Sequence, residues 1–175
     1  MTPTSHSTGM VRLTALVARS LDIDQGPYED RAGTFSKTGD TDSAMSFGLI
    51  RGGHIDVTVL GGLQIDAEGH LANWMIPGKL VPGMGDAMDL VSGAKRAIVG
   101  TQHAAKGKSE IVQKCGLPLI SSRPFDLVVT DIAVIGFSNR RITLQDTAPG
   151  VSVAVVVAIT GADLFVPANV PQMKI

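Results

Sequence analysis

The chain has 175 residues and a formal net charge of −1, and no run of lysine or arginine exceeds two residues, so neither a nucleic-acid partner nor a polybasic membrane surface is expected. A single domain of this length can bury a self-sufficient core. Hydrophobic residues make up 44 % and charged residues only 18 %, which indicates surplus apolar surface and an interface with another chain.

The beginning of the chain gives weak structural signals. Residues 8–21 show a short helical pattern, and residues 1–21 contain serine, threonine and two arginines but no acid. We expect a frayed start followed by one helix, with an organelle transit peptide as the alternative. Residues 22–44 are polar and aperiodic and predict a long loop. No stretch has the ~18 uninterrupted apolar residues that a membrane helix needs.

The only cysteine, Cys115, excludes an intrachain disulfide and fits a reducing compartment. Its sequence context favours a half-buried structural thiol over a nucleophile. We therefore expect a cytoplasmic protein, and the mitochondrion is the alternative.

Residues 45–95 stand out because they hold ten of the twenty glycines and the only tryptophan. Residues 55–60 predict a buried strand between two glycine pairs. A polar turn follows at residues 66–69, then an extended segment at residues 71–76. Residues 82–87 form a glycine-rich loop in front of a helix predicted at residues 88–94. Free amide groups at such a helix start commonly hold an oxygen anion.

The second half of the chain is rich in strand signals. Strands are predicted at residues 96–101, 125–130 and 132–137, and residues 141–145 are expected to pair back across a turn. Residues 103–107 predict a polar turn, and residues 109–115 a turn or short extended piece. Residues 151–159 are ambiguous, because five valines favour a strand whereas the flanking Pro149-Gly150 and Gly161 favour a helix.

Several motifs occur in an order that resembles one family: IRGGHIDVTVLGG, GHLANWMIPGKLVPGMGDAMDLVSGAKRAIV, HAAKGKSEIVQKCGLPL, VVTDIAV and TGADLFV. The chain resembles the B-type subunit of the 3-oxoacid CoA-transferases, the succinyl-CoA:3-ketoacid and 3-oxoadipate enzymes. The resemblance runs from about Gly26 to the C-terminus. It divides the chain into an atypical segment, residues 1–25, and a domain that is similar to the B-type subunit, residues 26–175.

This resemblance implies an α/β fold with the open mixed sheet of the family I CoA-transferases. It also implies an oligomer with an A-type subunit and an active site at the junction of the two subunits. Acyl-CoA is then a substrate, and no bound cofactor or metal is expected. CoA would move between succinyl-CoA and a 3-oxo acid, acetoacetate or 3-oxoadipate, through a glutamyl-CoA thioester.

The family's nucleophilic glutamate lies in a Ser-Glu-Asn-Gly segment, and none of the three glutamates here, Glu29, Glu68 and Glu110, precedes Asn-Gly. The expectation is therefore that the N-terminal part of the domain is missing or replaced, and no catalytic residue is assigned. An inactive, truncated paralogue that keeps the fold and the subunit interface is the alternative function.

The resemblance assigns two groups of site residues. The oxyanion and substrate loop comprises Gly83, Gly85, Asp86 and Ala87, and the candidates for the acyl or CoA pocket are Asn73, Trp74 and Lys79. Asp86 stands where the family usually has glycine. Its carboxylate either competes with a substrate oxygen for the loop amides or caps the following helix.

The remaining polar residues are expected to be structural. His54 and His70 lack a third ligand at a familiar metal spacing. Asp56 at a strand start, and Asp66 and Glu68 in a turn, need no catalytic role. Lys95 is a further candidate contact for the CoA phosphates, although single lysines on an α/β surface are usually just solvated.

Overall fold

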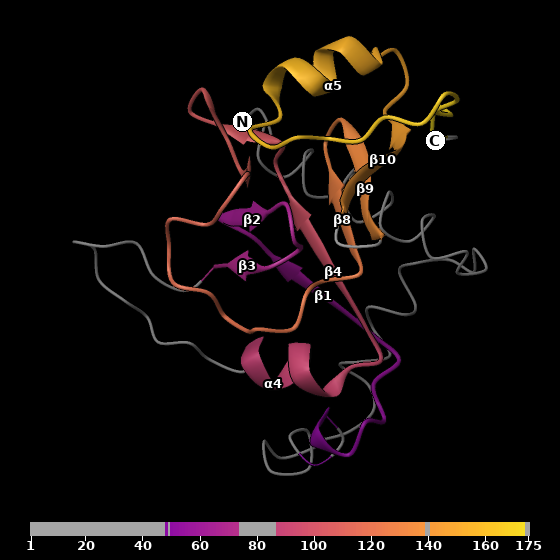
Figure 1. Cartoon of the computed structure of the whole chain (residues 1–175). Coiled ribbons are helices and arrows are strands. Elements are labelled where there is room, and N and C mark those ends of the chain that lie inside the picture. Colours follow the sequence, from indigo (N-terminus) through magenta and orange to yellow (C-terminus); the bar gives the residue numbers. More distant parts are fainter. Residues whose placement is uncertain (1–47, 49, 74–86, 139–140, 174–175) are drawn as a thin grey trace, which may run out of the picture.

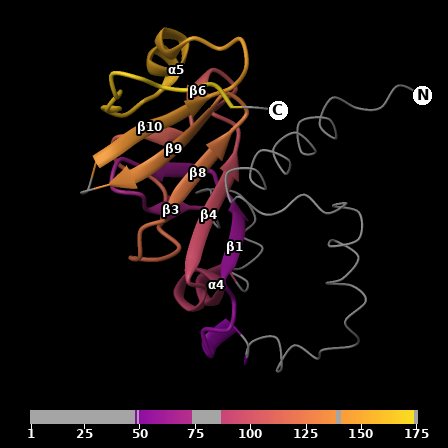
Figure 2. The ribbon, with the colours of Figure 1, turned by 90° about the vertical axis from the view of Figure 1, so that its right-hand side faces the viewer.

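The computed structural model describes residues 48, 50–73, 87–138 and 141–173, and its centre is a five-stranded mixed sheet (Figure 1). The strand order is β1 (Val57–Gly61), β4 (Arg96–Thr101), β8 (Leu127–Thr130), β9 (Ala133–Ser138) and β10 (Arg141–Thr147). Strands β1, β4 and β8 run parallel, and β9 and β10 continue antiparallel as a meander. Figure 2 shows these five strands side by side, with β1 at one edge and β10 at the other.

The pairing register aligns the three parallel strands. Gly61 of β1 lies opposite Gly100 of β4, and Thr101 of β4 lies opposite Thr130 of β8. All four residues of β8 are buried, as expected for a central strand covered on both faces. The carboxyl ends of β1, β4 and β8 therefore meet at one edge of the sheet.

Two small sheets lie beside the main one. The first contains β3 (Leu71–Ala72), β2 (Gln64–Asp66) and β7 (Ile111–Val112) in that order. The second is a hairpin of β5 (Ala104–Ala105) and β6 (Lys108–Ser109). Its two-residue turn has positive φ at Lys106 (53°) and Gly107 (75°), which suits the twist of a tight hairpin.

Besides the helical residues 50–51, the described fold contains two short helices, α4 (Ala87–Gly93) and α5 (Val153–Ile159). Helix α5 settles the ambiguity over residues 151–159 in favour of a helix. The Ser152 hydroxyl accepts a bond from the Val155 amide at 3.4 Å, and the helix ends at Thr160. The N-cap and packing of Val156 against the core therefore outweigh the strand preference of valine.

The core lies mainly on one face of the sheet. Alternation along the strands sends Ala97, Val99, Val128 and Ile135 to a large cluster, which also contains residues from the small sheets and α5. A smaller cluster on the other face contains Ile98, Leu127, Val129 and Val134.

The expected α/β class with a mixed sheet is confirmed, and so is the strand at residues 96–101. The helix predicted at residues 88–94 begins one residue earlier, and the strand predicted at residues 55–60 begins at Val57.

The polar turn predicted at residues 103–107 is wrong in part, because His103 is buried and only Lys106 and Gly107 turn. Strand β2 was not predicted. The helix at residues 8–21 and the loop at residues 22–44 lie outside the described residues.

Replacing Ile135 by alanine should destabilise the chain by about 2–4 kcal/mol, because this fully buried side chain would leave a cavity in the main cluster. Val59→Ala is the matched control, since Val59 is 47 % exposed and should cost less than about 1 kcal/mol. Urea unfolding measures both. Equal effects of the two substitutions would contradict this description of the core.

Candidate functional site

The candidate site lies at the carboxyl edge of the main sheet. Strands β1, β4 and β8 end there at Gly61, Thr101 and Thr130. In open α/β sheets, ligands bind outside the carboxyl ends of parallel strands, because the following loops leave the sheet there. Three polar clusters converge on this edge.

The first cluster consists of Asn73, which follows β3, and the Gly61 carbonyl at the end of β1. The Asn73 side-chain amide nitrogen donates to the Gly61 carbonyl at 3.1 Å, and this fixes the side chain against the end of β1. Its Oδ1 is buried and has no hydrogen-bond partner within the described part of the chain. A buried amide oxygen without a donor is unfavourable by about 1–3 kcal/mol, so Asn73 presents a vacant acceptor at the carboxyl edge.

The second cluster joins Thr101 at the end of β4 to Glu110. The Thr101 hydroxyl lies 3.1 Å from the Gly62 carbonyl and also contacts the Glu110 carboxyl. A hydroxyl has one proton, so Thr101 donates at any one time either to the Gly62 carbonyl or to the Glu110 carboxylate. Burial raises the pKa of Glu110, the Thr101 bond lowers it, and the charge of Asp131 raises it again. Glu110 is thus a half-buried carboxyl that holds its proton more tightly than usual.

The third cluster centres on His103, whose side chain is buried. Its Nδ1 lies 3.1 Å from the Thr130 hydroxyl and its Nε2 lies 2.8 Å from the Thr160 hydroxyl. The Thr160 hydroxyl donates to the Val156 carbonyl at 2.7 Å, so it must accept from Nε2–H. The Thr130 hydroxyl has one proton, which it can donate either to Nδ1 or to the Ala133 carbonyl at 3.0 Å, so the neutral imidazole bonds Thr160 through Nε2–H and competes with that carbonyl for the Thr130 proton.

Burial lowers the pKa of His103 to about 4, and the charge of Asp131 opposes this shift. The His103 backbone amide also donates to the Asp131 carboxylate at 2.8 Å. His103 therefore joins the ends of β4 and β8 to the end of α5. It supports the carboxyl edge and is not a proton donor near neutral pH.

The turn between β2 and β3 accounts for two further polar residues. One Asp66 oxygen accepts from the amides of Glu68 at 3.0 Å and His70 at 2.9 Å, and the other lies 3.2 Å from the His70 Nδ1. These contacts stabilise the turn, as the sequence predicts. Within the described ranges, no group of three His, Cys, Asp or Glu side chains could hold a metal ion.

Cys115 and Lys95 are also placed by their contacts. The Cys115 thiol is half-buried, 3.6 Å from the Gln64 carbonyl, and burial raises its pKa to about 11, which fits the predicted structural role. Lys95 bonds Asp56 at 2.6 Å, just before β4 and β1 begin. Lys95 therefore lies at the amino ends of the strands, away from the carboxyl edge.

The predicted site residues divide into two groups. Asn73 is at the carboxyl edge, and Ala87 is the first residue of α4 and packs against the main core cluster. The others lie outside the described residues: Trp74, Lys79, Gly83, Gly85 and Asp86. Sequence reasoning missed Thr101, His103 and Glu110. The available signal was that Thr101 and His103 lie at the carboxyl end of a strand that was correctly predicted.

In the part of the chain that the structure describes, no helix has the length and apolar character needed to cross a membrane.

Comparison with known proteins gives consistent matches. The family described as Coenzyme A transferase matches residues 28–158. The chain is 53 % identical over 135 residues to the beta subunit of the acetate CoA-transferase of Haemophilus influenzae, covering 77 % of this chain and 60 % of that protein. It is 49 % identical over 130 residues to the B-type subunit of a probable succinyl-CoA:3-ketoacid coenzyme A transferase of Bacillus subtilis, covering 74 % and 60 %. The chain thus spans about 60 % of the length of these relatives.

Solved structures share the fold at lower identity. The decarboxylase AibA/AibB superposes with a TM-score of 0.62 at 22 % identity, covering 79 % of this chain and 59 % of that one. The acyl-CoA transferase YdiF from Escherichia coli O157:H7 gives 0.62 at 20 % identity, covering 74 % and 30 %. These likenesses concern the fold alone, since proteins of one fold can catalyse different reactions.

The His103 network predicts a pH dependence of stability. Because its folded-state pKa of about 4 lies below the ordinary 6.5, the unfolded chain binds the proton first as pH falls. Neutral, buried His103 contributes about 3 kcal/mol to the free energy of unfolding. This contribution is complete above pH 6.5 and is lost as the pH falls toward 4.

His103→Gln can keep one donor and one acceptor but cannot titrate, so most of this loss should disappear from its urea unfolding curves. His54→Gln, at an exposed histidine, is the matched control and should behave like the original chain. An unchanged acid dependence in His103→Gln would refute the assignment.

Proposed function

Because the Coenzyme A transferase family matches residues 28–158, this chain belongs to that family, and we propose that it is a B-type subunit that moves CoA between an acyl-CoA and a free carboxylic acid. The observation that carries the proposal is the 53 % identity to a beta subunit across 77 % of the chain. Identity this high over the described fold favours a working subunit over an inactive paralogue.

Succinyl-CoA is the proposed CoA donor and a 3-oxo acid, acetoacetate or 3-oxoadipate, the proposed acceptor. A relative at 49 % identity is named as the B-type subunit of a probable succinyl-CoA:3-ketoacid transferase. The acetate CoA-transferase name of the relative at 53 % identity supports acetate as a second candidate acceptor. Both reactions exchange CoA between carboxylic acids, so they share one chemistry.

The chemistry requires a carboxylate nucleophile and a group that stabilises an oxyanion. A glutamate attacks the thioester carbonyl, CoA leaves as a thiolate and an acyl-glutamyl anhydride forms. The thiolate then attacks the glutamyl carbonyl, releases the first acid and leaves a glutamyl-CoA thioester. The second acid repeats these steps in reverse. The resemblance places the nucleophile in a Ser-Glu-Asn-Gly segment, so the proposal assigns it to none of Glu29, Glu68 and Glu110.

The proposed contribution of this chain is binding and charge stabilisation. Amides of the loop at Gly83, Gly85, Asp86 and Ala87 would stabilise the oxyanion, in competition with the Asp86 carboxylate. Asn73, Trp74 and Lys79 would line the acyl or CoA pocket. The Asn73 Oδ1, which has no hydrogen-bond partner among the described residues, supports this, because it can accept a hydrogen bond from an N–H or O–H group of bound acyl-CoA.

An A-type subunit is the proposed partner, since the relatives are named as beta or B subunits. No bound cofactor is needed for the proposed steps, in which acyl-CoA is itself a substrate. The lone cysteine supports a reducing location such as the cytoplasm, and the mitochondrion remains the alternative.

Joined to the Ser-Glu-Asn-Gly segment of a relative and mixed with an A-type subunit and succinyl-CoA, the chain should convert acetoacetate to acetoacetyl-CoA, which is followed by its absorbance. Mass spectrometry should detect a protein-bound CoA thioester during turnover. Acetate in place of acetoacetate tests the second acceptor. A complex that forms and binds acyl-CoA, yet gives neither product nor adduct with either acid, would contradict the proposal and favour the inactive alternative.

Asn73→Ala in the same complex should lower kcat/KM for acyl-CoA by about 5- to 100-fold, the loss of one hydrogen bond from a buried acceptor. Asn169→Ala, at an exposed asparagine, is the matched control and should leave kcat/KM unchanged. Asn73→Asp keeps the acceptor oxygen but loses the donor to Gly61, so it separates the two contacts. Full activity of Asn73→Ala would exclude Asn73 from the site.

A further inference from the structure

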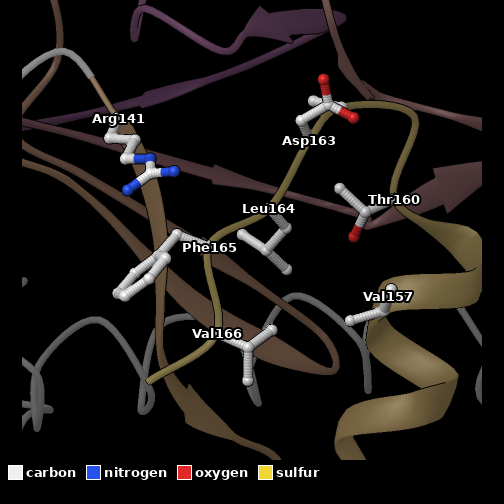
Figure 3. A pocket seen from close by; sticks show the side chains of 8 residues that line it. Arg141, Val157, Thr160, Asp163, Leu164, Phe165 and Val166 are labelled. Carbon is white, nitrogen blue, oxygen red and sulfur yellow. The ribbon is translucent and has the colours of Figure 1, made fainter. Parts of the chain in front are cut away.

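A hollow of about 490 Å³ lies between helix α5 and the start of β10 (Figure 3). Its size falls in the range of about 300–1,000 Å³ that small-molecule sites occupy. The lining comes from three parts of the chain: Arg141 of β10, Val157 of α5, and residues 160 and 162–166 of the segment that follows α5. Polar and apolar side chains both line the hollow, so it suits a molecule that has one ionic group and an apolar body.

The segment after α5 is held in place by backbone contacts on both of its sides. The Phe165 amide donates to the Ile142 carbonyl of β10 at 2.9 Å, and the Leu144 amide donates to the Phe165 carbonyl at 2.9 Å. The Asp163 amide donates to the Gln113 side chain at 3.0 Å. A preformed wall favours binding, because less of the chain has to be ordered when a ligand enters.

Arg141 is the side chain of the lining that can bind an anion. Its guanidinium lies 5.0 Å from the centre of the Phe165 ring, and this cation–π contact holds it beside the hollow. Within the described ranges, the guanidinium makes no ion pair and no hydrogen bond. Its planar set of N–H donors matches the two oxygens of a carboxylate. Arg141 therefore presents a cationic donor that no described residue uses.

The other polar side chains of the lining do not compete for Arg141. The Thr160 hydroxyl donates to the Val156 carbonyl at 2.7 Å and accepts from His103, so its proton is already engaged. Figure 3 shows the Asp163 carboxylate pointing away from Leu164. No ion pair joins it to Arg141 in the part of the chain that the structure describes. The guanidinium is thus left for a ligand.

We propose that this hollow binds a small organic monocarboxylate, whose carboxylate contacts Arg141 and whose hydrocarbon body packs against Val157, Leu164 and Val166. Val157 is 45 % exposed, and covering it removes apolar surface from water. This favours an acid with a hydrocarbon chain over one without. A phosphate fits less well, because a doubly charged anion is usually held by several cationic or amide donors, whereas Arg141 is the single basic residue among the described lining residues.

This site is separate from the one proposed for CoA transfer. It adjoins β10 at one edge of the main sheet, whereas Asn73 is bonded to β1 at the other edge (Figure 2). Carboxylate binding can be measured on the full chain alone, without acyl-CoA and without an A-type subunit. Failure of this proposal would therefore leave the CoA-transfer proposal untouched, and the reverse also holds.

The first experiment titrates the full chain with hexanoate by isothermal titration calorimetry. Three comparison ligands separate the parts of the molecule: acetate lacks the hydrocarbon chain, 1-hexanol lacks the charge, and inorganic phosphate is a different anion. Hexanoate should bind more tightly than each of them, and more tightly than 1-hexanol by about tenfold or more, the contribution of a hydrogen bond to a charged group. Absence of saturable hexanoate binding, equal binding of 1-hexanol, or tighter binding of phosphate would each overturn the proposal.

The second experiment removes the cation. Arg141→Gln keeps a polar side chain but no charge, so it should weaken hexanoate binding by about tenfold or more and leave 1-hexanol binding unchanged. Arg96→Gln, at an exposed arginine that begins β4, is the matched control and should bind hexanoate as the original chain does. Circular dichroism checks that both variants are folded. Equal hexanoate affinity of the two variants would contradict the assignment of Arg141.

Discussion

The parallel register of β1, β4 and β8 is the constraint on which the rest of the structure depends. It aligns Gly61, Thr101 and Thr130 at one edge of the sheet. The buried, neutral His103 then joins this edge to the end of α5 through two threonine hydroxyls. Residues from four separate segments of the sequence therefore lie near one another, although no local pattern brings them together.

The fold provides this edge, but particular residues determine its chemistry. A decarboxylase and an acyl-CoA transferase share the fold, so the sheet alone does not specify the reaction. Identity near 50 % to beta and B subunits supports the proposed CoA transfer, and we propose that the substrate meets the described residues at Asn73, whose Oδ1 has no hydrogen-bond partner among them. Glu110 and Thr101 form a second polar pair nearby, in which a raised carboxyl pKa results from burial.

Much of the fold could be predicted because its signals are local. The apolar run at residues 96–101 and the turn at Asp66 both formed as their sequence patterns indicate. Helix α5 could not be decided from valine content, because the Ser152 cap and the packing of Val156 determine it. His103 was expected in a polar turn, since burial of a histidine depends on Thr130 and Thr160, which are distant in sequence. The assignment of Asn73 came from resemblance, and its vacant oxygen became visible only in the structure.

The central claim is that acyl-CoA binds at the carboxyl edge of the parallel strands. Amide hydrogen exchange of this chain in complex with an A-type subunit, measured with and without succinyl-CoA, tests it most directly. The account predicts that succinyl-CoA slows exchange at residues 61–62, 73 and 101–103, while exchange at the amino ends, near Asp56 and Lys95, stays unchanged. Protection confined to the amino ends, with none at the carboxyl edge, would contradict it.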